Sequence, residues 1–193
     1  NKLFYGIIEL ENQNASALSS DVICFWEDGN KQILKKSYKQ VKFDYLFESP
    51  GPGCTFILNK IFAVQLQTFI KTYQVKLPEL HDWFIYAFAR ENGLKWHISS
   101  NPLMLYRQHE NNQCGANIGF KAIYQRINLV KEGWYKSEVI GLISLLFNQQ
   151  NLLKRFVKLS FLDRLILSAQ VFKFRRNKKD ALFLAFVLIV GIM

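Results

Sequence analysis

The residues best suited to chemistry in this 193-residue chain lie in its middle third. In the stretch 77–93, LPELHDWFIYAFARENG, His81 and Asp82 are followed at once by bulky apolar residues, and the run stays apolar until Arg90. A helix that is apolar nearly all round is normally buried. A carboxylate at its start is costly unless it is paired or used. Asp82 is therefore either a first-turn charge that stabilises the helix dipole or a group that takes part in a reaction.

A glycine-rich turn precedes this helix in the sequence ESPGPGCTFILNK, residues 48–60. The Gly51-Pro52-Gly53 run predicts an irregular turn, and Cys54–Leu58 is predicted to be a buried strand. The alternative is an ordinary Gly-Pro turn with no functional role. Cys54 is not expected to be a nucleophile, because no histidine lies near it in the sequence. The three cysteines are widely spaced, without a CxxC pair, and are interpreted as reduced thiols.

The surrounding pattern predicts a mixture of helices and strands, which place these groups in an α/β fold. Helices are predicted at 2–10, 61–74 and 77–93, the last with Gly93 as its stop. Strands are predicted at 21–26, 31–36, 94–99 and 103–109, with a hairpin turn at Asp28-Gly29 between the first two. His97 in the 94–99 strand is interpreted as structural.

From about residue 120 the sequence becomes helical and basic. Apolar residues recur every three to four positions without proline, which predicts two or three helices. Residues 151–180 carry nine Lys and Arg against two Asp, a local net charge of +7 in a chain of net charge +10. Such a block favours an anionic surface, membrane or nucleic acid. Residues 181–193 are uncharged, and at ~1.5 Å per residue they reach roughly 20 Å. They are predicted to form a buried helix, an interfacial segment or part of a membrane span.

The ordered motifs GPGCTFILNK, HDW, ENG and YRQHENNQCGAN resemble those of family 2 glycosyltransferases of the GT-A fold, particularly the rhamnosyltransferase-like branch that builds bacterial surface polysaccharides. The match covers about residues 48–117. The resemblance implies an α/β fold: a partial, Rossmann-like GT-A acceptor half with mixed strands in residues 1–119, and a helical, membrane-associating region in 120–193. The Asp-x-Asp motif of the family's nucleotide-binding half does not occur, and Glu9-Leu-Glu11 is a poor substitute.

The resemblance also implies roles for individual residues. The family carries its catalytic base at the position of Asp82, where it would take the acceptor hydroxyl's proton in an inverting transfer. His109 would complete the shell of a divalent metal, Mn²⁺ or Mg²⁺, which needs the nucleotide-binding half. The remaining candidates would bind the substrates: Gly53, Cys54, Thr55, His81, Trp83 and Arg107. The alternatives are a core position for Trp83, a buried structural histidine at 81 and a solvated polar loop around His109.

These observations predict a glycosyltransferase fragment with a nucleotide-sugar donor and a lipid-linked or saccharide acceptor. We expect it at the cytoplasmic face of the bacterial inner membrane, attached peripherally or through its C-terminal region. The alternatives are a non-catalytic basic module that binds anionic membrane or nucleic acid, and an inactive glycosyltransferase remnant. No helix-turn-helix, zinc-finger or RNP-like sequence supports a nucleic-acid partner.

Overall fold

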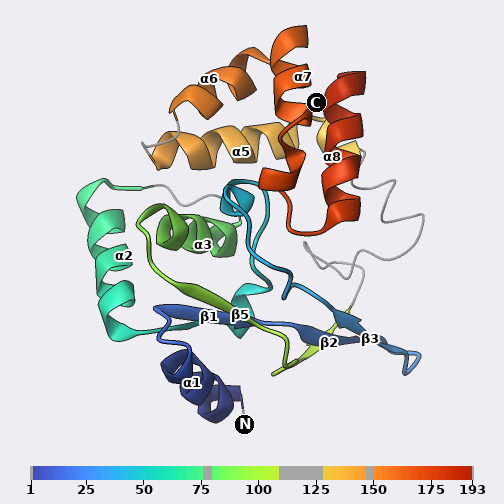
Figure 1. The fold of residues 1–193 in the computed structure, drawn as a ribbon. Helices are drawn as coiled ribbons and strands as arrows, with labels where there is room; N and C mark the ends of the chain where they lie inside the picture. Colours follow the sequence, from blue (N-terminus) through green and yellow to red (C-terminus); the bar gives the residue numbers. More distant parts are fainter. Residues whose placement is uncertain (1, 76–79, 109–127, 147–149, 193) are drawn as a thin grey trace. The chain divides into compact units, whose positions relative to one another are not determined.

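The computed structural model describes residues 2–75, 80–108, 128–146 and 150–192 (Figure 1). The chain divides into two compact units. The first contains Asn1–Tyr38 and Ser49–Asn117, and the second contains Lys39–Glu48 and Ile118–Met193. A ten-residue segment from the N-terminal part of the sequence thus belongs to the C-terminal helical unit.

The described elements of the first unit are a mixture of helices and strands, as the sequence predicts. They are α1 (Lys2–Asn12), β1 (Ala17–Ser20), β2 (Val22–Phe25), β3 (Lys31–Leu34), η2 (Gly53–Thr55), β4 (Ile57–Leu58), α2 (Lys60–Thr72), α3 (His81–Glu91), β5 (Trp96–Ser99) and β6 (Leu105–Arg107). The three predicted helices are confirmed, and Gly93 follows α3 with a φ of 70°. The hairpin is confirmed as well, with Gly29 at a φ of 82°. Strand β1 was not predicted, because its sequence ALSS lacks the branched and aromatic residues typical of strands.

Two three-stranded sheets organise this unit. In the first, β1 lies between β4 and β5, antiparallel to β4 and parallel to β5, with Ala17 opposite Trp96 and Ser20 opposite Ser99. In the second, β2 lies between β3 and β6, antiparallel to β3 and parallel to β6. The strand pairs β1/β5 and β2/β6 run parallel, so chain segments far apart in sequence meet at the carboxyl ends of β1 and β5.

The β1 sheet is covered on both faces (Figure 1). Leu18 faces α1 and packs with Leu10 and Ala15. On the other face, the Trp96 ring makes an edge contact with Tyr86 of α3 at a centroid distance of 5.2 Å. Residues alternate between the faces of a strand, so β1 and β5 are buried in a three-layer arrangement.

The predicted strand over Cys54–Leu58 is wrong for its first half. Residues Gly53–Thr55 form a 3₁₀ turn, and only Ile57–Leu58 pair as a strand. Cys54 is exposed rather than buried. The turn arises because the amide of Thr55 donates to the carbonyl of Pro52 at 2.8 Å, which closes a local loop instead of a strand ladder.

The second unit contains more helices than predicted. Its described elements are η1 (Asp44–Leu46), a helical stretch at 128–131, α5 (Trp134–Leu145), α6 (Gln150–Lys158), α7 (Phe161–Ser168), η3 (Val171–Lys173) and α8 (Lys178–Val190). The breaks come from polar caps that interrupt a continuous apolar period. Ser160 and Asp163 form a reciprocal capping box at the start of α7, and Asn177 caps α8.

The segment Lys39–Glu48 supplies part of this unit's core. Phe47 is fully buried and stacks on Phe174 at a centroid distance of 4.4 Å. Its ring also lies 5.2 Å from Phe156 of α6. Aromatic pairs of this kind add to the free energy gained from burying apolar area, so the segment is integral to the helical unit.

A buried ion network ties the same segment to the sequence before α8. The Arg176 guanidinium is fully buried and contacts Asp44 at 3.2 Å and Glu48 at 3.3 Å. The Arg176 amide also donates to Glu48 at 2.6 Å. Tyr135 and Arg175 both donate to the carbonyl of Phe47. Burial raises the pKa of Tyr135 to about 12, although Arg175 acts against it, so the phenol keeps its donor proton at neutral pH.

The uncharged C-terminal stretch is a helix that is half-buried in its own unit. One face of α8 packs inward through Ala181, Leu184, Val187 and Leu188. Over the described residues, no helix combines the length and apolar character needed to cross a membrane. The sequence left three alternatives for residues 181–193, and the buried face of α8 agrees with the first of them, a buried helix.

Replacing Arg176 with Met should destabilise the chain strongly. The change leaves the buried Asp44 carboxylate without its cation, and breaking such a pair typically costs about 3–5 kcal/mol. Urea unfolding followed by circular dichroism at 222 nm measures the loss. Arg107→Met is the control, because the Arg107–Glu27 pair is exposed and should contribute less than about 1 kcal/mol. Equal losses for the two variants would contradict the role given to Arg176.

Candidate active site

The candidate site is built around the turn at residues 49–55. Gly51 adopts a φ of 148°, which disfavours other residues. The Ser49 hydroxyl donates to the carbonyl of Gly51 at 2.6 Å, and the Thr55 hydroxyl donates to the carbonyl of Pro52 at 2.7 Å. The turn is therefore held by its own side chains in one conformation.

Strand β1 anchors this turn. The Ser19 hydroxyl donates to the carbonyl of Pro50 at 3.1 Å and accepts from the indole of Trp96 at 3.0 Å. A Cβ on Gly51 would lie 3.3 Å from the carbonyl oxygen of Ser20. The carboxyl end of β1 and the turn are thus in direct contact, and a larger residue at 51 would separate them.

Gly53 brings the turn next to Asp82. A Cβ placed on Gly53 would lie 3.1 Å from the Cβ of Asp82 and 3.8 Å from its Oδ2. Such a contact is tighter than side chains normally make, so glycine allows the approach. The structure therefore joins two of the predicted site residues that are 29 positions apart in the sequence.

Asp82 lies in the first turn of α3 and is half-buried. Its Oδ1 accepts the backbone amide of Trp83 at 2.8 Å. Within the described part of the chain, no residue donates a hydrogen bond to Oδ2. One carboxylate oxygen is therefore held at the start of α3, and the other lies beside Gly53. The same position also places its charge favourably for the helix dipole.

The neighbours of Asp82 on α3 have different environments. His81 is exposed, so it is accessible to a ligand. Trp83 is only 3% exposed. Its ring offers almost no surface to a sugar. The predicted substrate-binding role of Trp83 is therefore wrong, and Trp83 is a core residue. Thr55 is fully buried, with its hydroxyl used inside the turn, so its role is to shape the turn.

Lys2 is a site residue that the sequence did not indicate. Its ammonium donates to the carbonyl of Cys54. Desolvation raises the pKa of the Cys54 thiol above its ordinary value. Asp82 also raises it, whereas Lys2 and a backbone hydrogen bond lower it. The thiol is therefore protonated at neutral pH, in agreement with the expectation that Cys54 is no nucleophile. No local pattern predicts this contact, because 52 positions separate the two residues.

Asp21 is a second carboxylate near the turn, but its hydrogen bonds are used within the fold. It is 3% exposed, and its oxygens accept the amides of Lys36 and Ser37 and the hydroxyl of Ser37. The Lys36 side chain lies 3.9 Å from the Cβ position of Gly51. Asp21 thus holds a lysine-bearing segment beside the turn.

The predicted group at 107–109 is only partly described. Arg107 lies on β6, is exposed, and pairs with Glu27 at 2.9 Å. His109 lies outside the described residues. Glu9 is the nearest substitute for an Asp-x-Asp carboxylate. Its side chain is hydrogen-bonded to His97 at 2.9 Å and to Ser99 at 2.8 Å. Glu9 and His97 therefore tie α1 to β5.

The described residues do not form a binding site for a divalent metal by themselves. In residues 2–75, 80–108, 128–146 and 150–192, no three or more His, Cys, Asp or Glu side chains lie together so that they could hold a metal ion. We therefore derive no reaction step through a metal from these residues.

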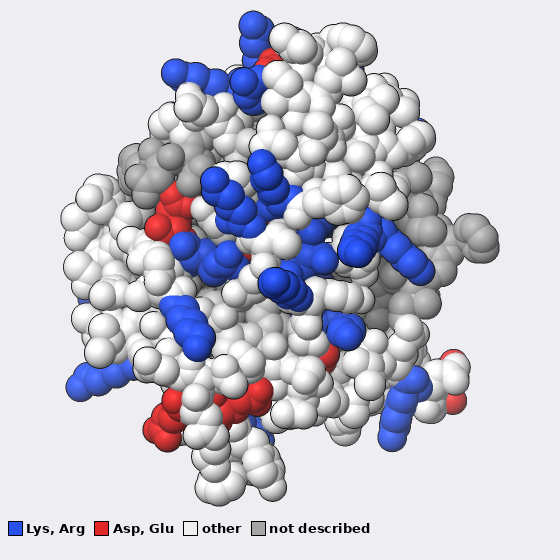
Figure 2. All heavy atoms as spheres, viewed as in Figure 1, with Lys and Arg blue, Asp and Glu red and all other residues white. Residues whose placement is uncertain are grey.

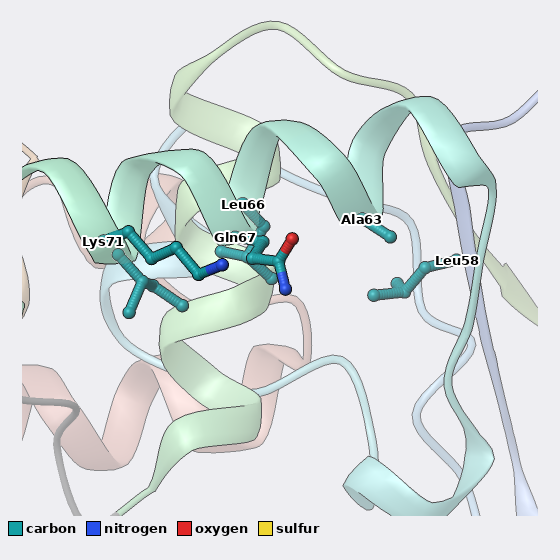
Figure 3. A pocket seen from close by; sticks show the side chains of 6 residues that line it. Leu58, Ala63, Leu66, Gln67 and Lys71 are labelled. Carbon is teal, nitrogen blue, oxygen red and sulfur yellow. The ribbon is translucent and has the colours of Figure 1, made fainter.

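An apolar groove lies on α2, away from these groups (Figure 3). Its volume is about 260 Å³, and its lining residues are Leu58, Ala63, Leu66, Gln67, Ile70 and Lys71. The lining contains no carboxylate or imidazole, so the groove is suited to apolar packing rather than to acid–base chemistry.

The chain is similar in sequence to a rhamnosyltransferase, in agreement with the resemblance of its motifs. The chain is 40% identical over 181 residues to the dTDP-rhamnosyl transferase RfbG of Shigella flexneri. The aligned region covers 93% of this chain but 62% of the length of that relative. No family model matches the chain, and no solved structure matches it significantly. The assignment to family 2 and the GT-A fold therefore stays a prediction.

Replacing Gly53 with Ala should displace Asp82. The added methyl group would overpack the contact and cost about 1–3 kcal/mol of stability. Thermal unfolding measures this loss, and combining the change with Asp82→Gly should remove most of it. Gly141→Ala is the matched control. It lies within α5 with no atom within 4 Å of its Cβ position, so it should be neutral or stabilise by up to about 1 kcal/mol.

Proposed function

We propose that this chain is the acceptor-side part of an inverting glycosyltransferase and that Asp82 is its general base. The observation that carries the proposal is the close approach of the Gly53 turn to Asp82, which places a carboxylate oxygen beside an irregular loop. The identity to a dTDP-rhamnosyl transferase supports the same conclusion. From the name of that relative, we propose dTDP-rhamnose as the donor.

The proposed reaction is a single displacement. Oδ2 of Asp82 accepts the proton of the acceptor hydroxyl as that oxygen attacks the anomeric carbon. A new glycosidic bond forms on one side while the bond to the nucleoside diphosphate breaks on the other, and the electron pair leaves with the diphosphate. No covalent sugar–protein intermediate is needed, so an unreactive thiol at Cys54 is compatible with this chemistry.

The turn would position the acceptor for this attack. No described residue accepts a hydrogen bond from the amide of Gly53, whereas the amide of Cys54 donates to its own thiol. The Gly53 amide can therefore donate to a sugar hydroxyl, and His81 is exposed at the start of α3. Lys2 holds the carbonyl of Cys54 and would keep the loop in place. Arg107 and His109 remain candidates for the diphosphate and a divalent metal, respectively.

We further propose that α1 packs against a donor-binding segment that this chain lacks. Its outward side chains are large and apolar, with exposed fractions from 42% to 61%: Leu3, Phe4, Tyr5, Ile7 and Ile8. Five such residues on one helix form a patch that normally marks an interface. The relative is longer than the region aligned with this chain, so its uncovered part is the occupant we propose. The α2 groove adds apolar surface beside β4 of the same unit.

The acceptor we propose is a lipid-linked or polymeric saccharide at the cytoplasmic face of the bacterial inner membrane. The basic composition of residues 151–180 supports a location near an anionic surface. The single experiment that decides the function is transfer from dTDP-rhamnose to such an acceptor by the chain joined to the donor-binding segment.

In that joined enzyme, Asp82→Asn should retain the fold and donor binding but lose transfer. Asn keeps the shape of the side chain but cannot accept the proton, and loss of a general base typically costs a factor of about 10² to 10⁴ in rate. The turnover number and the melting temperature of this variant are each compared with those of the unchanged enzyme. A variant that melts lower but transfers at nearly the original rate would show that Asp82 serves only the helix dipole. His109→Ala is the contrast, because it should weaken metal-dependent donor binding.

The chain by itself should show no rhamnosyl transfer, and adding the uncovered part of the relative as a separate polypeptide should restore it. Release of dTDP in the presence of the acceptor measures turnover. Phe4→Ser with Ile8→Ser should weaken the association by about tenfold or more, since two buried apolar contacts would be lost. Ile33→Ser, also at an exposed apolar side chain, is the control. Full complementation by the α1 double variant would exclude α1 as the interface.

A further inference from the structure

We propose that the outer faces of α7 and α8 form an apolar ridge that inserts into the surface of an anionic membrane. The exposed members of this ridge come from two neighbouring helices, and their exposed fractions lie between 41% and 72%: Phe161, Leu162, Leu165, Leu182, Phe186, Ile189 and Val190. The inference rests on the location at a membrane that is part of the proposed function. It does not depend on Asp82 or on any sugar donor.

The spacing places these residues on one side of each helix. On α8, Leu182, Phe186 and Ile189 recur at intervals of four and three, which is the period of a helix face. Ala181, Leu184 and Leu188 lie on the opposite, buried side. The helix is therefore apolar both toward its own core and toward solvent, and a helix that is apolar all round is expected to be buried on all sides.

The two outer faces meet at one end of the helix pair. Helices α7 and α8 pack against each other. A Cβ on Gly191 would collide with the Arg164 guanidinium, so the start of α7 lies beside the end of α8. Phe161 and Leu162 at that start are 72% and 65% exposed. Figure 2 shows a broad area over α7 and α8 with almost no charged side chains.

The charges around this ridge favour an anionic partner. Lys154 and Lys158 are exposed on α6, where basic side chains border the uncharged area in Figure 2. The two acidic residues of 151–180 are largely engaged at helix starts. Asp163 is buried in the α7 capping box and pairs with Arg155, and Asp180 lies in the first turn of α8. The exposed charge beside the ridge is therefore positive.

Two further lysines are placed where they oppose helix stability. Lys178 and Lys179 occupy the first turn of α8 and are exposed, although positive charge at a helix N-terminus is unfavourable. This placement is explained if the lysines contact lipid phosphates at the edge of the inserted face. Apolar side chains beside lysines are the combination that interfacial helices use.

A deletion of residues 151–193 would not test this inference, because it would remove Arg176 from the buried network with Asp44. Point variants of the full chain avoid the problem. The test variant is Phe161→Ser with Leu162→Ser, whose side chains are exposed and should not be needed for folding. The matched control is Ile61→Ser with Val64→Ser on α2, which are 70% and 52% exposed.

Flotation with phosphatidylcholine vesicles, with and without phosphatidylglycerol, measures binding. The wild-type chain should float with anionic vesicles and less with neutral ones. The Phe161/Leu162 variant should bind anionic vesicles about tenfold more weakly, while the α2 control binds like wild type. Lys154→Gln with Lys158→Gln should reduce binding to anionic vesicles alone, and added salt should have a similar effect.

Three outcomes would overturn the proposal. The first is unchanged vesicle binding by the Phe161/Leu162 variant. The second is binding to an oligonucleotide without binding to vesicles, which would identify the basic surface as a nucleic-acid site. The third is a wild-type dimer that becomes a monomer in this variant while vesicle binding stays the same, which would make the ridge a contact between copies. None of these results depends on sugar transfer, so they are distinguishable from failure of the proposed function.

Discussion

The first unit depends on the four buried residues of β1, Ala17–Ser20, which pair with β4 on one side and β5 on the other. Three of these residues, Ala17, Ser19 and Ser20, are small, and Leu18 packs against α1. The hydroxyl of Ser19 also forms hydrogen bonds that an apolar side chain could not form. Ser19 links the indole of Trp96 to the carbonyl of Pro50, and the carbonyl of Ser20 is in contact with the Gly51 turn. The core strand and the candidate site are therefore one hydrogen-bonded structure.

The helical unit depends on a different kind of constraint, a buried charge. Arg176 has no access to solvent and is neutralised by Asp44 and Glu48, which come from a segment 128 or more positions earlier. Charges without solvent require their partners in fixed positions. The network therefore fixes where Lys39–Glu48 enters this unit, while Phe47 supplies the apolar contact. The basic C-terminal sequence is thus a folded unit with a specific core rather than a solvated tail.

Much of the fold could be predicted because long elements have strong local patterns. Helices α1, α2 and α3 were predicted from apolar periodicity, and the turn at Gly29 from its Asp-Gly pair. The predictions failed where a local pattern was weak or ambiguous. ALSS is too short and polar to indicate a strand, and GCT closed into a 3₁₀ turn instead of extending. The continuous period after residue 120 concealed the breaks at Ser160 and Asn177, because a capping residue resembles any other polar position.

The sequence by itself determined the classes of element, the concentration of basic charge, and a resemblance to rhamnosyltransferases that the 40% identity bears out. These properties are carried by neighbouring residues or by ordered motifs, so they need no knowledge of packing. Only the tertiary structure decided which groups meet. Gly53 reaches Asp82, Lys2 reaches Cys54, and Arg176 reaches Asp44 across gaps of 29 to 132 positions. Such contacts follow from strand pairing and close packing, and neither is encoded in the spacing of any one segment.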